Sequence, residues 1–228
     1  MRARDVMVRA VVTTSPDTTV EKLARLMLNL RISGVPVMDK DGRLVGMVTE
    51  GDLLRRVEIG TERHRPRWSK PFSSNSRLAA EYVKSHAKRV ADIMTQEVCS
   101  VEELATLGEI ADLLETKHIK RVPVVHDGKI VGIVSRADLL KVLVSGGAET
   151  AHEEQDRTIR VQLLADLRNQ KWADPSEGRV IVTDGIVHLW GIVRSENERR
   201  ALRIAAENTP GVRGVEDHTE FALAPPAM

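Results

Sequence analysis

The stretch from residue 46 to residue 54 is Gly-Met-Val-Thr-Glu-Gly-Asp-Leu-Leu, and it returns at residues 132–140 as Gly-Ile-Val-Ser-Arg-Ala-Asp-Leu-Leu. Around these two stretches the whole run 5–54 recurs, changed but recognisable, as 92–140. A repeat of this length marks a structural unit. It favours a paired module with two related clefts over an enzyme built around one catalytic centre.

Each copy is expected to fold as a helix, two strands and a second helix. Helical spacing predicts one buried helix face in each copy. The residues of these faces are Val20, Leu23, Ala24 and Met27 in the first copy, and Leu107, Ile110, Ala111 and Leu114 in the second. We therefore expect the two copies to form a pseudo-symmetric pair of the α/β (α+β) class.

The strands follow from short apolar runs joined by turns. The runs around Pro36 and Pro123 predict buried strands, and the Asp-Gly turns at 41–42 and 127–128 predict hairpins leading to second strands. These second strands are expected at 44–48 and 130–134.

A hydroxyl residue ends the second strand of each copy, and an aspartate lies three positions on. These pairs are Thr49 with Asp52 and Ser135 with Asp138. A helix N-terminus with free N–H groups can hold a phosphate, and an ionised Asp accepts two hydrogen bonds, which suits the hydroxyls of a ribose. The alternative is a capping box, which satisfies the same N–H groups without a ligand. Both roles are compatible at one site.

In this order, the motifs resemble a tandem pair of CBS domains, also called a Bateman module. The resemblance covers roughly residues 1–57 and 88–145. It implies that the hydroxyl and the Asp of each pair contact the phosphate and ribose of an adenosine nucleotide. It further implies AMP, ADP or ATP as a regulatory ligand, ahead of NADH or S-adenosylmethionine, and a homodimer formed through the pair.

Further ligand contacts are expected beside the strand at the start of each hairpin. Val35 and Val122 are expected to lie where a purine is sandwiched. Nucleotide-regulated CBS relatives have basic residues at the positions of Lys120 and Arg121, which makes these two candidate phosphate contacts; a solvated basic face is the alternative. The first copy has Ser33-Gly34 instead, so the two clefts are not expected to be equivalent.

The C-terminal part resembles a BON domain. A helix with Ile159, Leu163 and Leu167 on one face precedes strands at 179–182 and 186–190, and a further helix and a strand at 212–221 follow. Ser195 to Glu198 predicts a capping box. The family is associated with phospholipid surfaces, but acidic residues outnumber basic ones here, so a membrane-surface role stays open. We expect an interaction module.

The domain boundaries follow from these resemblances and from changes in composition. We expect the first repeat at 1–57, a basic insert at 58–87, the second repeat at 88–145, a linker at 146–152, the BON-like domain at 153–223 and a tail at 224–228. The insert combines basic residues such as Arg63, Arg65 and Arg67 with aromatic ones. A linker with a helix at 77–87 is preferred there, and RNA binding is kept as an alternative.

Other classes of function are disfavoured by what the sequence lacks. A net charge of +1 gives no overall electrostatic footprint for nucleic acid. No catalytic motif is present, and the seven histidines show no paired metal-ligand spacing, so we expect neither a catalytic nor a metal site. A single cysteine and no signal or membrane-spanning segment favour the cytoplasm.

Two hypotheses remain ahead of nucleic-acid binding. The first is a non-enzymatic sensor that binds an adenosine nucleotide in the clefts and relays this to an unknown protein partner through the BON-like domain. The second is a structural adaptor with empty clefts.

Overall fold

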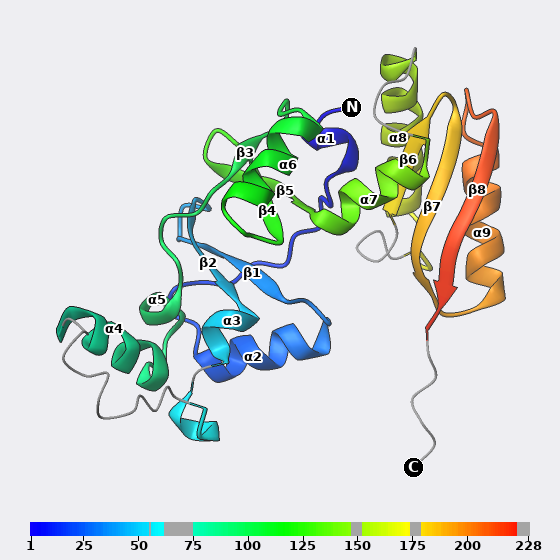
Figure 1. Cartoon of the computed structure of the whole chain (residues 1–228). Coiled ribbons are helices and arrows are strands. Elements are labelled where there is room, and N and C mark those ends of the chain that lie inside the picture. Colours follow the sequence, from blue (N-terminus) through cyan, green and yellow to red (C-terminus); the bar gives the residue numbers. More distant parts are fainter. Residues whose placement is uncertain (55, 62–74, 147–151, 174–178, 223–228) are drawn as a thin grey trace. The chain divides into compact units, whose positions relative to one another are not determined.

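The computed structural model describes residues 1–54, 56–61, 75–146, 152–173 and 179–222 (Figure 1). The expected positions 63, 65 and 67 of the basic insert and the tail 224–228 lie outside these residues. The chain divides into two compact units. The first contains residues 1–11, 100–126 and 131–228, and the second contains residues 12–99 and 127–130.

The second unit is built on the first repeat. Its elements are α2 (Val20–Asn29), β1 (Gly34–Met38), β2 (Leu44–Thr49), α3 (Glu50–Leu53), the short 3-10 helix Val57–Ile59, α4 (Asn75–His86) and α5 (Val90–Ile93). Strands β1 and β2 pair antiparallel. Leu23 and Met27 on α2 are buried against them, with Val35, Val37 and Val48, so the expected hairpin and most of the helix face are confirmed. Ala24, also expected on this face, is only half-buried.

The first unit holds the second repeat and the C-terminal domain. The first unit contains α1 (Ala3–Val6), which belongs to the start of the first repeat. From the second repeat it contains β3 (Val101–Glu102), α6 (Leu107–Thr116), β4 (Arg121–His126), most of β5 (Lys129–Ser135) and α7 (Arg136–Val144). Ile110 and Leu114 of α6 are buried as expected. The prediction that Ala111 is buried is wrong, because this residue is exposed and Leu113 is half-buried instead.

The C-terminal domain is a sheet with helices packed on one face. Its elements are α8 (Glu153–Arg168), β6 (Arg179–Thr183), β7 (Ile186–Val193), α9 (Glu196–Glu207) and β8 (Gly214–Phe221). The strand order is β6-β7-β8, with β6 antiparallel and β8 parallel to β7. Ile159 and Leu163 of α8 pack against Val180 and Val187 in the core of this domain.

Two local features show how this domain is held. Asp156 on α8 accepts hydrogen bonds from the backbone N–H groups of Asp184 and Gly185, at 2.9 and 2.7 Å, and so fixes the hairpin turn between β6 and β7. Ser195 accepts from the N–H of Glu198 as expected, but the Glu198 carboxylate accepts from the N–H of Arg194. The predicted reciprocal capping box is therefore shifted by one residue on its second bond.

Repeats and compact units divide the chain differently. Each unit combines the hairpin of one repeat with the short N-terminal helix that precedes the other. In the first unit, Met7 packs against Gly132, and in the second, Met94 packs against Gly46. A Cβ atom on either glycine would overlap the methionine side chain, so these glycines are needed for close packing.

Candidate functional site

In the first repeat the predicted pair Thr49 and Asp52 forms a capping box at the start of α3. The Asp52 carboxylate accepts hydrogen bonds from both the backbone N–H and the hydroxyl of Thr49, each at 2.9 Å. Its other oxygen pairs with the ammonium group of Lys84 on α4 at 3.1 Å. The capping box, given above as the alternative to a ligand contact, is therefore present in the structure. The sequence did not indicate the lysine partner of Asp52.

The second repeat has the same arrangement at the start of α7. Asp138 accepts from the N–H of Ser135 at 2.9 Å and from its hydroxyl at 2.6 Å. Lys141 lies 3.4 Å from the other carboxylate oxygen of Asp138. Asp138 is 2% exposed, so this ion pair is largely screened from water.

Four other predicted contacts have different positions. Val35 and Val122 are fully buried in the hydrophobic cores of the two repeats, and this packing accounts for them without a ligand. Lys120 is exposed, and its backbone carbonyl accepts from the N–H of Arg136. Arg121 is half-buried as the first residue of β4. The structure does not bring these four side chains together with the capping boxes in one described cavity.

Asp138 lines a cavity of about 260 Å³ inside the first unit. Its wall combines the segment Val6–Ala10 of the first repeat and Lys141 of the second with residues of the C-terminal domain. The latter are Arg160, Leu164 and Arg168 of α8 and Val180 and Ile181 of β6. One carboxylate and several cations therefore surround a partly apolar space, a composition that suits an anionic ligand with hydroxyl groups.

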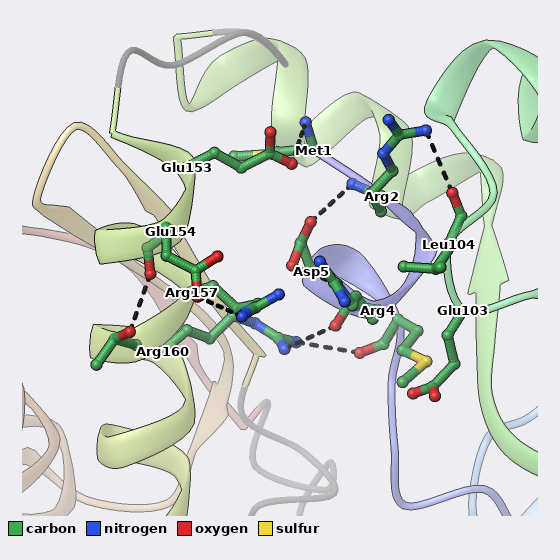
Figure 2. Close-up of polar contacts among 12 residues, drawn as sticks. Met1, Arg2, Arg4, Asp5, Glu103, Leu104, Glu153, Glu154, Arg157 and Arg160 are labelled. Carbon is green, nitrogen blue, oxygen red and sulfur yellow. Dashed lines mark hydrogen bonds and ion pairs between the residues drawn. The ribbon is translucent and has the colours of Figure 1, made fainter.

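Arg160 joins the two parts of this cavity wall. Its guanidinium donates to the backbone carbonyl of Arg4 at 3.1 Å (Figure 2). It also donates to the carbonyls of Met7 at 3.1 Å and Val180 at 2.8 Å. Burial lowers the pKa of Arg160 to about 10, so it keeps its charge at neutral pH. The contact of Arg160 with Met7 joins residues more than 150 positions apart, and no sequence motif indicated it.

Further polar contacts surround Arg160. Figure 2 shows Asp5 accepting from the N–H of Arg2 at 2.7 Å, and the terminal amino group of Met1 beside Glu153 of α8 at 3.1 Å. Ile181 and Trp190 of the C-terminal sheet also pack in the core cluster that contains Met7. The C-terminal domain, expected from the sequence as a separate unit, thus shares a core with the second repeat.

The described part of the basic insert is partly neutralised within its own unit. Lys84 pairs with Asp52, and Arg89, just after the insert, lies 3.6 Å from Asp17. The guanidinium of Arg56 donates to the carbonyls of Lys84 and Ala87, which ties α4 to the end of the first repeat. These charges serve the fold of the insert.

Strands β7 and β8 bring together three residues that the sequence left scattered. The nearest side-chain nitrogen and oxygen atoms of His188, Glu216 and His218 lie 3.3–3.6 Å from one another. Burial lowers the pKa of His188, and the nearby Glu216 carboxylate opposes this effect. Only the parallel register of the strands, which places His188 opposite Glu216, could have indicated the cluster.

The two hairpins, each followed by a capping-box aspartate, form a tandem module, and the comparisons identify its family. The CBS domain model matches residues 3–59 and 90–145, and the BON domain model matches residues 155–222. The chain therefore belongs to the CBS-pair proteins, with a BON domain after the pair. Among its described helices, none is long and apolar enough to cross a membrane.

Individual relatives match the CBS pair. An uncharacterized protein of Methanocaldococcus jannaschii is 30% identical over 155 residues, which are 63% of this chain and 92% of that protein. The chloroplastic CBS domain-containing protein CBSX1 of Arabidopsis thaliana is 38% identical over 133 residues. That match covers 55% of this chain and 56% of the plant protein, so the chain spans little more than half of this relative.

One solved structure adds a ligand. The crystal structure of CBSX2 in complex with AMP is 28% identical to this chain, with a TM-score of 0.56. The match covers 64% of this chain and 99% of that one. A CBS pair similar to this one therefore binds AMP.

Proposed function

We propose that this protein is a non-enzymatic sensor that binds an adenosine nucleotide, AMP, ADP or ATP, through its CBS pair and relays the binding event through its BON domain to a protein partner. One observation carries the proposal: Asp138, a predicted ligand contact, and Arg160, a BON residue bonded to the CBS part, line the same cavity. A ligand at Asp138 therefore contacts both domains.

The chemistry around Asp138 suits a nucleotide. An ionised carboxylate accepts hydrogen bonds from the hydroxyl groups of a ribose, and Arg9, Lys141 and Arg168 provide positive charges for a phosphate. The Asp138 carboxylate is already bonded to Ser135 and Lys141, so a ribose competes with these partners. The AMP complex of CBSX2 supports the choice of ligand class.

The size of the cavity suggests how binding is transmitted. Pockets that enclose small molecules usually have volumes of about 300–1,000 Å³, and the cavity beside Asp138 measures about 260 Å³. In our proposal a whole nucleotide enters only when α8 moves away from the segment Val6–Ala10. Binding then favours the moved state, because a ligand shifts an equilibrium only through different affinities for its two states.

The first repeat is proposed as a second, unequal site. Thr49 and Asp52 repeat the capping box, but their lysine partner, Lys84, comes from the insert helix α4. The side chain of Asp52 is also more exposed than that of Asp138. Water therefore screens its electrostatic interactions with a ligand more strongly. We expect this site to bind more weakly.

Homodimerisation is the second part of the proposal. Helix α7 carries Leu140, Leu143 and Val144, which are 62%, 72% and 62% exposed. Such neighbouring apolar side chains are typical of a surface that another protein covers. We assign it to a second copy of the CBS pair.

A structural adaptor is the competing function, and one observation favours it. Both capping boxes are complete without any ligand, so neither Asp needs a nucleotide to satisfy its hydrogen bonds. The adaptor predicts no binding of any adenosine compound.

Calorimetric titration distinguishes the two functions. Wild-type protein is titrated with AMP, ADP, ATP, NADH and S-adenosylmethionine, and the titration is repeated with Asp52→Ala and Asp138→Ala. The sensor predicts binding of at least one of AMP, ADP and ATP, weakened about 10-fold or more by Asp138→Ala and less by Asp52→Ala. Circular dichroism confirms that the variants fold, and Asp112→Ala on the exposed face of α6 is the matched control. Absence of heat and of any thermal shift with all five compounds supports the adaptor.

A further inference from the structure

The BON domain contains a three-residue cluster that plays no part in the proposed nucleotide site. His188 on β7 lies opposite Glu216 on β8, and Trp190 lies opposite His218. Because side chains alternate between the two faces of a strand, these four share one face of the sheet. The parallel pairing of β7 with β8 therefore brings two imidazoles and a carboxylate together.

The distances between the three side chains are close to those of a metal site. Nδ1 of His188 lies 3.3 Å from both Nε2 of His218 and Oε2 of Glu216, and the last two atoms are 3.6 Å apart. A circle through three points with these separations has a radius of about 2.0 Å, and zinc bonds to histidine nitrogen and carboxylate oxygen measure about 2.0–2.2 Å. An ion near the centre thus lies within bonding distance of all three atoms.

We propose that His188, Glu216 and His218 bind a divalent transition-metal ion of the zinc class. Imidazole ligands suit zinc and its neighbours in the first transition series, and two histidines with one glutamate are a known zinc donor set. Two imidazole nitrogens and a carboxylate oxygen this close together repel one another unless a proton or a cation lies between them. A divalent ion satisfies all three together.

The surroundings hold the ligands in place and leave the ion accessible. The ring of His218 stacks on Trp190, with ring centroids 4.1 Å apart and an angle of 14° between the planes. The side chain of His188 is 5% exposed, whereas those of His218 and Glu216 are 25% and 54% exposed. A rigid buried ligand and two ligands open to solvent give the ion a route to the site and a fourth position for water.

The bound ion would link the last strand of the domain to its central strand. Because β8 ends the described chain and pairs with β7 alone, a bond across this pair restrains the edge of the sheet. The inference is independent of nucleotide binding, since none of the three ligands lines the cavity beside Asp138.

The test uses the full chain after treatment with a chelator. Zn²⁺ is titrated by calorimetry, and Co²⁺ is added in parallel because its visible absorption reports tetrahedral coordination. We expect one ion per chain. Binding should be weakened by at least about 10–100-fold in Glu216→Gln and in His218→Gln, because substituting residues that only hydrogen-bond to metal ligands already lowers metal affinity by this factor. The control His126→Ala removes a different His–Glu pair, with Glu103, and should bind as the wild type does.

Two results would overturn the inference. The first is a wild-type chain that binds neither Zn²⁺ nor Co²⁺ above the level of Glu216→Gln. The second is one-to-one binding that survives in both cluster variants, since the ion then binds elsewhere. Glu216→Gln preserves size at a half-exposed position, so misfolding does not obscure the comparison.

Discussion

Met7 accepts a hydrogen bond on its backbone carbonyl from the Nη2 atom of Arg160 at 3.1 Å, while its side chain packs against Gly132. One residue near the N-terminus thus contacts both the BON helix α8 and the hairpin of the second CBS repeat. Asp138 and Arg160 line the cavity beside it. This contact gives the proposed relay a physical basis, because a movement of α8 alters the surroundings of the ligand site directly.

The Arg160 contact is testable by substitution. Arg160→Met leaves the carbonyls of Arg4, Met7 and Val180 without this donor in a buried setting, so the free energy of unfolding should fall by about 1–3 kcal/mol. Arg157→Met, on the same helix, removes only an ion pair with Glu154 and should cost about 0–1 kcal/mol. Urea unfolding curves of both variants provide the measurement. Equal losses would show that the Arg160 contacts are not specific.

Close packing of methionine on glycine makes a second prediction. Gly132→Ala and Gly46→Ala should each lower the free energy of unfolding by about 1–3 kcal/mol, because Met7 and Met94 must shift to admit a methyl group. Gly108→Ala lies at an open helical position and should raise the free energy of unfolding by up to about 1 kcal/mol. Thermal unfolding of the three variants tests this ranking of stabilities. A Gly132→Ala variant as stable as the wild type would contradict the prediction.

The proposed dimer surface predicts a change of mass. Wild-type protein should elute as a dimer in size-exclusion chromatography with light scattering, and Leu143→Asp should elute as a monomer because it buries a charge at the interface. Leu104→Asp changes another apolar residue, 59% exposed and outside α7, and should remain dimeric. A wild-type protein that is monomeric at high concentration, or a Leu143→Asp variant that is still dimeric, would contradict the assignment of α7 to the dimer interface.

Glu58 provides a pH-dependent contribution. Hydrogen bonds from the Arg56 guanidinium lower the pKa of this carboxyl below its usual 4.5. A carboxyl with a lowered pKa stabilises the fold above its unfolded pKa, and the contribution is lost as the pH falls through the folded value. An NMR titration should place the Glu58 midpoint below 4.5 in the wild type and at a higher pH in Arg56→Met, where a backbone hydrogen bond still lowers the pKa in part. A midpoint of 4.5 or higher in the wild type contradicts the prediction.

The sequence predicted what depends on local pattern. Leu23 and Ile110 lie on buried helix faces, and both Asp-Gly hairpins form, because spacing and turn chemistry are properties of a few neighbouring residues. The capping boxes of Asp52 and Asp138 could be given as the alternative to ligand contacts for the same reason. Ala111 was placed wrongly, since its small side chain says little about which edge of a helix face is covered.

Contacts between distant residues could not be predicted in this way. Arg160 bonds to Met7 only because α8 packs beside the N-terminal segment, and a lone arginine in a helix gives no sign of this. His188 meets His218 through a strand register that spacing along the chain does not reveal. Lys84 reaches Asp52 from an insert that interrupts the repeat. Each of these pairs depends on tertiary packing.

The relay itself is measured most directly by the fluorescence of Trp190, which packs in the core cluster shared with Met7. Trp68→Phe and Trp172→Phe together leave Trp190 as the single tryptophan. Adding AMP, ADP or ATP should shift its emission to longer wavelength in proportion to the fraction bound, as α8 and the sheet move and water reaches the ring. The shift should be absent in Asp138→Ala at the same nucleotide concentration. Saturated binding by calorimetry with no change in Trp190 emission would contradict the relay.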